Sequence, residues 1–263
     1  LLLIDECHLP QEAINGLWPQ INLGQETNIY RMGIRMDTEE SLMLVLEGEE
    51  PQPPEFDVDI PISAVYTPPD ANLTVLAGED HLLYTILGRP LRVSARSFFQ
   101  VNTLMAEKMI RFLLTNLDLA EKTSVLELYA GVGLFSAFIT PQVSTLTAIE
   151  SSGSACHDFT VNLSEFDNVS LYEAYVEEAL PHITKKVDVL IADPPRAGLA
   201  PQVHDALGEI KPNQIAYISC DPATLARDAR KIIQKGYRLT SVTPFDLFPQ
   251  TAHIETIVLL NRE

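Results

Sequence analysis

From about residue 105 onward, short apolar runs alternate with segments whose apolar residues recur at helical spacing. The apolar runs are typical of strands buried on both faces of a sheet, and they cover residues 124–129, 145–150, 169–174, 187–192 and 214–219. Helix-like segments lie between or after them, at residues 134–140, 153–163, 176–182, 201–209 and 222–235. This alternation predicts an α/β fold with a doubly wound, Rossmann-like parallel sheet. Two last runs, 238–244 and 256–261, are joined by a short loop and are expected to pair antiparallel.

The first 89 residues have a different pattern. A helix-like stretch at 10–23 precedes short strand-like runs at 27–36, 42–47, 60–66, 72–76 and 82–87. An acidic, proline-rich connector at 48–55 interrupts these runs. We predict a smaller α+β domain with an antiparallel sheet at residues 1–89, and the α/β domain at 90–263. Because Leu1–Ile4 lacks a preceding charged segment, we interpret it as a strand of a longer protein rather than a signal peptide.

Composition narrows the class of protein. With 46% hydrophobic and 21% charged residues among 263, the chain is expected to be globular. Its apolar runs fall short of the ~20 residues that a membrane span needs. Cys7, Cys156 and Cys220 form no closely spaced pair, which favours a reducing cytoplasm. The net charge of −18 weighs against nucleic-acid binding, unless a local basic patch or a further domain supplies the contacts.

A glycine-containing loop follows the first buried strand. Gly131 and Gly133 permit a tight turn and close approach to a ligand, and the next strand ends in Glu150, which is placed to accept ribose hydroxyls. Dinucleotide enzymes and methyltransferases share this arrangement, and a purely structural turn is the alternative. Ser136 replaces the third glycine of dinucleotide loops, which favours S-adenosylmethionine. So does the turn Asp193–Arg196 (Asp-Pro-Pro-Arg), although it could simply end a strand.

Two residues are candidates for covalent chemistry. Cys220 follows the strand at 214–219, and Asp221 and Pro222 suit the cap and first turn of a helix. A thiol at a helix N-terminus ionises more readily, whereas a free cysteine is also a common core residue. Glu255 begins an apolar strand, where burial would raise its pKa and suit it as a proton acceptor. His253 is a rival base, and a polar strand edge is the alternative for both.

Five segments together resemble the bacterial RNA uracil-C5-methyltransferases, which make 5-methyluridine in tRNA and 23S rRNA. The matching segments are residues 97–102, 126–135, 193–198, 219–228 and 248–255. Their order and spacing make the resemblance specific over the C-terminal two thirds of the chain. Residues 1–89 look similar to the central domain of that family.

The resemblance implies methyl transfer from S-adenosylmethionine to carbon-5 of a uridine in rRNA or tRNA, through a covalent bond between cysteine and uracil. It implies that Cys220 is the nucleophile and Glu255 the proton acceptor. The residues expected to contact the cofactor or lie beside it are Gln100, Tyr129, Glu150 and Asp193. The chain departs from the family pattern at Leu134, where Asn is frequent, and at Tyr175, where Asn or Asp is frequent.

Other expectations concern cluster ligands and a domain that would lie outside these 263 residues. Cys7 looks like the last ligand of an iron–sulfur cluster found in some members, whose other ligands would precede residue 1. The family's N-terminal RNA-binding domain is likewise expected outside these 263 residues, which would account for the acidic charge. Two alternatives remain. An amino-group methyltransferase would use the Asp-Pro-Pro turn without the cysteine, and a non-catalytic RNA-binding module would fit the charge.

Overall fold

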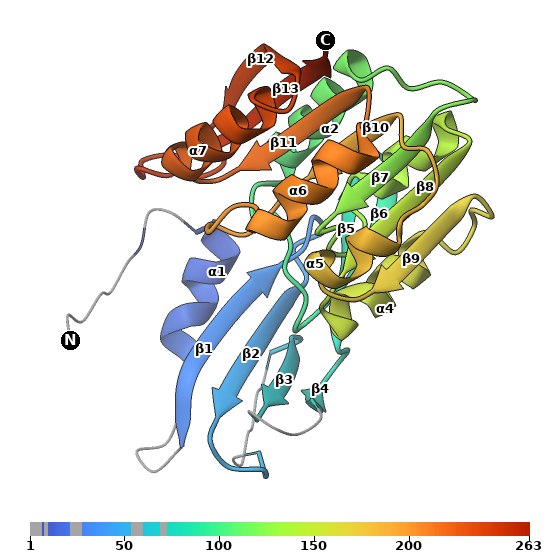
Figure 1. Ribbon diagram of the computed structural model, residues 1–263. Helices are drawn as coiled ribbons and strands as arrows, with labels where there is room; N and C mark the ends of the chain where they lie inside the picture. Colours follow the sequence, from blue (N-terminus) through green and yellow to red (C-terminus); the bar gives the residue numbers. More distant parts are fainter. Residues whose placement is uncertain (1–6, 8–9, 22–27, 54–59, 69–72) are drawn as a thin grey trace. The chain divides into compact units, whose positions relative to one another are not determined.

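The computed structural model describes residue 7 and residues 10–21, 28–53, 60–68 and 73–263 (Figure 1). The predicted strand at 1–4, and the ends of predicted runs at 22–23, 27 and 72, lie outside these residues. The chain forms two compact units, Leu1–Ala95 and Arg96–Glu263. None of the described helices is long and apolar enough to cross a membrane.

The first unit is α+β. A short helix α1 (Glu12–Leu17) continues into a 3-10 turn η1 (Trp18–Gln20). Four strands form one sheet in the order β1 (Ile29–Met36), β2 (Leu42–Gly48), β3 (Ser63–Thr67) and β4 (Thr74–Ala77). The expectation of an antiparallel sheet is wrong at one position, because β2 and β3 pair parallel. The connector after β2 is long enough for a parallel return, which a tight hairpin could not provide.

A two-stranded ribbon completes the first unit. Strand β5 (His81–Ile86) turns back at Gly88 into β6 (Arg89–Ser94), and the two pair antiparallel. The sequence pattern placed a domain boundary between residues 89 and 90, which is the start of β6. The structure divides after Ala95 because β6 stays paired with β5.

The second unit contains a seven-stranded sheet of mostly parallel strands, in the order β12-β13-β11-β10-β7-β8-β9. The strands are β7 (Ser124–Leu128), β8 (Thr145–Glu150), β9 (Val169–Glu173), β10 (Val189–Ala192), β11 (Gln214–Ser219), β12 (Tyr237–Phe245) and β13 (Glu255–Arg262). The prediction of a doubly wound α/β sheet is confirmed. The last two strands pair antiparallel, as expected, and β13 lies between β12 and β11.

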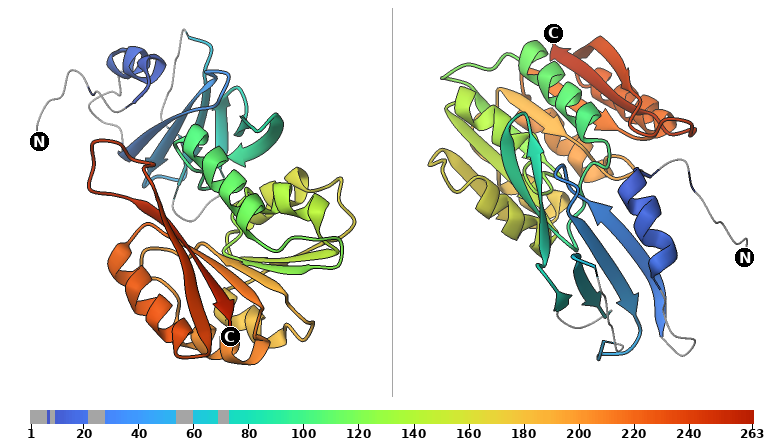
Figure 2. Two further views of the ribbon diagram at one scale, coloured as in Figure 1. Left: turned by 90° about the horizontal axis from the view of Figure 1, so that it is seen from above. Right: turned by 180° about the vertical axis from the view of Figure 1, so that it is seen from behind.

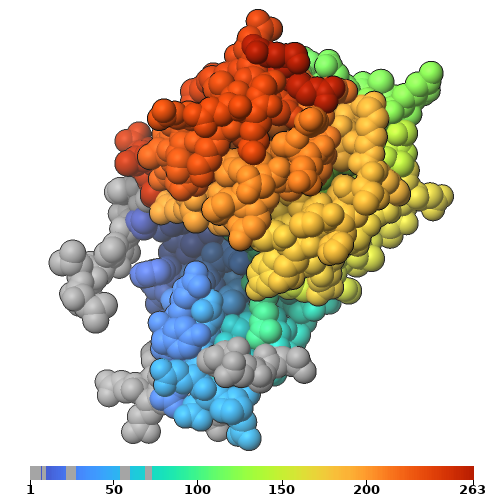
Figure 3. Space-filling model, viewed as in Figure 1, coloured from blue at the N-terminus to red at the C-terminus, as the bar shows by residue number. Residues whose placement is uncertain are grey.

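Helices cover both faces of this sheet (Figure 2). One face carries α2 (Thr103–Asn116), α3 (Ser136–Ile139) and α4 (Gly153–Asn162), and the other carries α5 (Val176–Ala179), α6 (Pro201–Ile210) and α7 (Pro222–Ile233). Short 3-10 turns η2 (Thr140–Gln142) and η3 (Leu180–His182) extend α3 and α5. In the space-filling view, α6 and α7 form much of the visible surface of this unit (Figure 3). The sequence pattern did not assign α2, although its Asn102 cap accepts from the Met105 N–H at 3.1 Å.

A buried carboxylate ties the helices of the second face to the loop after β10. Asp228 of α7 is fully buried and its two oxygens accept hydrogen bonds from several elements. The donors are Leu199 N–H at 2.9 Å, the Tyr217 hydroxyl at 2.9 Å, His204 Nε2 at 3.1 Å, and Arg227 Nε at 2.8 Å and Nη2 at 3.0 Å. A Cβ at Gly198, where φ is +77°, would collide with Asp228 and Arg227. The residues after Asp193 are therefore fixed to the helix that follows Cys220.

We predict that Asp228→Asn lowers the free energy of unfolding by about 3 kcal/mol, because an amide cannot accept on its nitrogen and leaves buried donors unmet. Burial raises the pKa of Asp228, but hydrogen bonds from Arg227, Leu199, Tyr217 and His204 outweigh it and lower that pKa overall. The stabilisation is therefore present at neutral pH and lost as pH falls through the lowered value. Urea unfolding at neutral and acid pH measures both effects.

Asp205→Asn is the matched control, since Asp205 is exposed and lies 3.6 Å from Lys235. Its substitution should change stability by less than about 0.5 kcal/mol. Equal stability of the two variants at neutral pH would contradict the role given to Asp228.

Candidate functional site

The sheet order reverses between β7 and β10. From β7 the chain proceeds outward through β8 to β9, and β10 then returns to the other side of β7. Their last residues, Leu128 and Ala192, are register partners, so the loops that follow leave side by side. In open α/β sheets such a switch point creates a ligand-binding crevice at the carboxyl ends of the strands. Tyr129 and Asp193 are the first residues beyond those ends.

The loop after β7 is organised around Glu150. The Gly131 N–H donates to Glu150 Oε2 at 2.8 Å, and the Ser151 and Ser152 N–H groups donate to Oε1 at 2.8 and 2.7 Å. These bonds fix the carboxylate at the end of β8, beside the loop. The structure therefore brings together Gly131 and Glu150, as the sequence predicted.

The two loop glycines have different surroundings. A Cβ on Gly133 would lie 2.5 Å from Leu163 and 2.9 Å from Phe159, so this glycine allows the loop to pack on α4. A Cβ on Gly131 would meet open space, although its φ of +55° also favours glycine. Only Gly131 therefore offers the close backbone approach to a ligand that was expected of both. Tyr129 also has a positive φ, +60°, an uncommon conformation for a side chain of this size.

A buried acid beneath the loop was missed by the sequence analysis. Glu127 of β7 is buried and accepts a short hydrogen bond from the Ser136 hydroxyl. Burial, aided by the nearby charges of Asp193 and Glu150 and opposed by the Ser136 hydrogen bond, raises the pKa of Glu127 to about 8. The signal in the sequence was a lone acidic residue inside an otherwise apolar buried strand. Glu127 therefore lies close enough to both Asp193 and Glu150 to interact with them electrostatically.

Cys220 and Glu255 meet through the antiparallel register of β11 and β13. Ser219 and Thr256 are the last register partners, and Cys220 and Glu255 are the next residues on each side, so the two lie close together at this end of the pair. The charge of Glu255 acts on the Cys220 thiol, which agrees with this proximity.

The Glu255 carboxyl is unusually poor in partners. Its residue is 6% exposed, and Oε2 is buried without a hydrogen-bond partner. Burial raises the pKa of Glu255, and the charge of Arg196 partly opposes the shift. Burial and Glu255 together raise the pKa of Asp193 to about 7. A buried acceptor left open in this way is costly for stability and is characteristic of functional sites.

The Cys220 thiol experiences opposing influences. Burial and the charge of Glu255 raise its pKa, while a hydrogen bond and positive charge from Arg196 lower it, leaving it raised. Asp221 caps α7 as predicted, accepting from the Thr224 N–H at 2.8 Å. Arg196, quoted in the sequence motif without a role, is therefore the group that favours the thiolate. One of its nitrogens also lies 2.9 Å from Nδ1 of His253.

Other candidates lie apart from these contacts. Gln100 is buried ahead of α2, and none of the interactions described above involves it. Cys156 is buried in α4 and burial raises its pKa to about 11, with Glu173 and Glu150 adding to the effect. Cys7 belongs to the first unit, where its carbonyl accepts from Asn15 at 2.8 Å. The described residues contain no group of three or more His, Cys, Asp or Glu suited to a metal ion.

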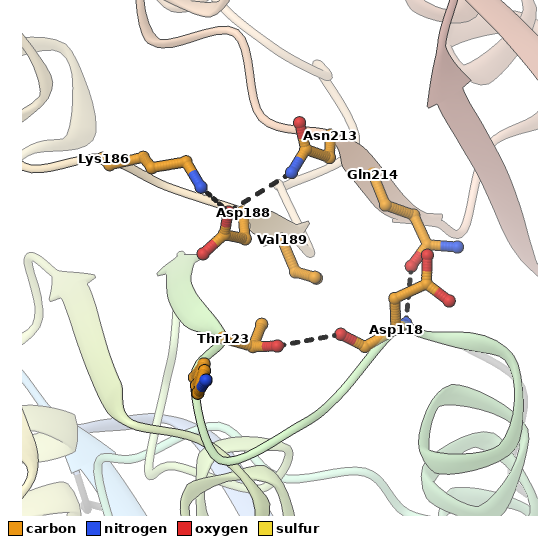
Figure 4. Close-up of a pocket in the computed structure, with 8 residues that line it drawn as sticks. Asp118, Thr123, Lys186, Asp188, Val189, Asn213 and Gln214 are labelled. Atoms are coloured by element: carbon orange, nitrogen blue, oxygen red, sulfur yellow. Dashed lines mark hydrogen bonds and ion pairs between the residues drawn. The ribbon is translucent and has the colours of Figure 1, made fainter.

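A polar pocket lies at the other end of the strands, near the amino ends of β7, β10 and β11 (Figure 4). Its side chains are engaged with one another, since Asp188 lies 2.6 Å from Lys186 and accepts from Asn213 at 3.2 Å. Gln214 likewise accepts from the Asp118 N–H at 2.9 Å. These bonds stabilise the amino ends of the strands, whereas the candidate site lies at their carboxyl ends.

Sheet order and loop placement define the Rossmann-like fold of S-adenosylmethionine-dependent methyltransferases. Within that class, a family model described as tRNA (uracil-5-)-methyltransferase matches residues 88–189 and 184–263. The chain belongs to this family.

Curated relatives support the same assignment. The chain is 38% identical over 190 residues to an uncharacterized RNA methyltransferase of Streptococcus mutans, covering 70% of this chain and 42% of the relative. It is 34% identical over 203 residues to the 23S rRNA (uracil(1939)-C(5))-methyltransferase RlmD of Aliivibrio fischeri, covering 75% and 46%. The chain thus spans less than half of the length of these relatives.

Solved structures agree on the fold. The tRNA (uracil-54, C5)-methyltransferase of Pyrococcus abyssi, in complex with S-adenosyl-L-homocysteine, is similar with a TM-score of 0.71 and 26% identity, covering 87% of this chain and 59% of that one. Trm5b of Pyrococcus abyssi is similar with a TM-score of 0.56 at 15% identity, covering 92% and 78%. The second likeness concerns the fold alone.

We predict that Glu255→Gln lowers the pKa of the Cys220 thiol, because the substitution removes a negative charge that opposes thiolate formation. Alkylation of Cys220 near neutral pH should therefore become faster, measured by mass spectrometry of its peptide across a pH series. Glu177→Gln is the control, since Glu177 faces Tyr129 instead. Unchanged alkylation in Glu255→Gln would show that the two groups are not coupled.

Proposed function

We propose that the protein containing this chain transfers a methyl group from S-adenosylmethionine to carbon-5 of a uridine in RNA, with Cys220 as nucleophile and Glu255 as proton acceptor. One observation carries the proposal: a thiol and a buried carboxyl with an unpartnered oxygen oppose each other at the carboxyl ends of the strands. Family membership supplies the type of reaction. Relatives named for rRNA and for tRNA make either RNA a suitable substrate.

In the proposed mechanism, the Cys220 thiolate adds to carbon-6 of the uracil, forming a sulfur–carbon bond and making carbon-5 nucleophilic. S-adenosylmethionine, when bound, supplies an electrophilic methyl group to carbon-5. Glu255 then removes the proton from carbon-5, and the sulfur–carbon bond breaks to restore the thiolate. The raised pKa of Glu255 suits a base that must hold a proton at neutral pH. The target base must leave its stack to reach the crevice.

The crevice fits the proposed cofactor. Open space at Gly131 lets a ligand approach the loop backbone, and the carboxylate of Glu150 is positioned to accept ribose hydroxyls. Glu127, Glu150 and Asp193 interact electrostatically around the crevice, an arrangement that favours a positively charged ligand. S-adenosylmethionine carries positive charge on its sulfonium and amino groups. Gln100 and Tyr129 belong to the same proposed contact set on the basis of the family resemblance.

RNA is the proposed partner, bound in a cytoplasmic setting. Because the chain carries a net charge of −18, we attribute much of the phosphate contact to segments beyond these 263 residues. Cys7 as the last ligand of an iron–sulfur cluster belongs to the same proposal, with the remaining ligands upstream. The resemblance further implies an RNA-binding domain in the full protein, in addition to the two units Leu1–Ala95 and Arg96–Glu263.

A covalent adduct tests the nucleophile. Full-length protein incubated with 5-fluorouridine RNA and S-adenosylmethionine should form a stable protein–RNA adduct. A base can remove hydrogen from carbon-5 as a proton, but it cannot remove the fluorine, so the covalent intermediate is not resolved. Cys220→Ala should form none, and Cys156→Ala should behave as wild type because its thiol is buried in α4. Adduct formation or methyl transfer by Cys220→Ala would refute the nucleophile and favour amino-group methylation.

A second experiment tests the base. With ordinary uridine RNA, we expect Glu255→Gln to accumulate a methylated covalent complex, since the amide cannot accept the carbon-5 proton. We expect its turnover to fall by a factor on the order of 10² to 10⁴, the usual contribution of a positioned base. Denaturing gels of radiolabelled RNA measure the complex. Turnover at the wild-type rate would remove Glu255 from this role.

A further inference from the structure

His253 contacts the guanidinium of Arg196, a residue to which the proposed mechanism gives no role. One guanidinium nitrogen of Arg196 lies 2.9 Å from its Nδ1 and 3.4 Å from its Nε2. A guanidinium is always protonated and can only donate, so the nearer imidazole nitrogen must be the acceptor. The shorter distance makes Nδ1 the acceptor of the Arg196 hydrogen bond. A nitrogen engaged in this way is not free to take the carbon-5 proton.

The loop around His253 holds the ring in place. Its backbone N–H donates to the Thr251 hydroxyl at 3.2 Å, and that hydroxyl donates to the Phe248 carbonyl at 2.7 Å. The Phe248 ring meets the imidazole edge to face, with ring centroids 6.1 Å apart. Gln250, inside this turn, has a φ of +66°. The imidazole is thus fixed by its own loop and can fix the position of a partner.

Arg196 is surrounded by groups that compete for it. Cys220 follows β11, Asp221 caps α7 and Glu255 begins β13. The charge of Arg196 acts on Cys220, Asp221 and Glu255. Each carboxylate attracts the guanidinium away from the thiol. A further acceptor without negative charge, such as the imidazole of His253, would restrict Arg196 to one orientation without adding a competing charge.

We propose that His253 is a positioning residue whose imidazole holds the Arg196 guanidinium where its charge acts on the Cys220 thiol and favours the thiolate. This rests on the proposed role of Cys220 as nucleophile. His253 acts through Arg196 and does not itself touch the reacting atoms.

The test is the rate of iodoacetamide alkylation of Cys220 in the full-length protein, followed by mass spectrometry of its peptide over a pH series. Alkylation requires thiolate but neither RNA nor cofactor, so it can fail or succeed independently of the methyl-transfer proposal. We expect Arg196→Gln to slow alkylation near neutral pH about tenfold, the loss of one charge-assisted hydrogen bond. His253→Ala should slow it about threefold, on the order of a partial loss of that bond.

Three further variants separate positioning from a merely structural role. His253→Gln retains an acceptor oxygen and should restore alkylation close to the wild-type rate. The double variant Arg196→Gln/His253→Ala should match Arg196→Gln alone, because His253 acts only through Arg196. His182→Ala, at an exposed histidine in η3, should have no effect. Wild-type alkylation in His253→Ala, no rescue by His253→Gln, or additive losses in the double variant would each overturn the proposal.

Discussion

The site depends on how β13 is inserted into the sheet. If the strand following β12 had extended the sheet at its outer edge, its first residue would have lain away from β11. Because β13 instead runs antiparallel between β12 and β11, its beginning meets the end of β11. The register then determines which side chains face each other at that rim. A slip of one residue would send the carboxyl of Glu255 to the other face of the sheet.

The crevice concentrates acidic groups where desolvation makes their charge expensive. Glu127, Asp193 and Glu255 all have raised pKa values, each chiefly through burial. Protein interiors rarely keep such groups together without cations or functional reasons. Arg196 offsets part of this charge on the Cys220 and Glu255 side. A cationic ligand would offset it on the side of the glycine loop, so ligand binding and the protonation of these acids should be coupled.

Much of this organisation could be predicted from sequence. Buried strands are recognisable in the sequence as apolar runs. The ends of the parallel strands then fall at one rim of the sheet, and the structure has Glu150, Asp193 and Cys220 at or just beyond those ends. The parallel pairing of β2 with β3 could not be predicted, because pairing direction depends on the path of a connector rather than on strand composition. Arg196 and His253 were both visible in their motifs. Their contact joins residues far apart in the sequence, and no local pattern encodes such a pairing.

The antiparallel hairpin of β12 and β13 also bears on how the protein is assembled. The strands β7, β8, β10 and β11 precede it in the chain, so a partly folded molecule can present the thiol before its opposing carboxyl has docked. Glu255 and His253 both enter the site with this hairpin, so the group that opposes the thiolate and the group that orients Arg196 arrive in one step of folding. The environment of the thiol is therefore complete only when the last strand has paired.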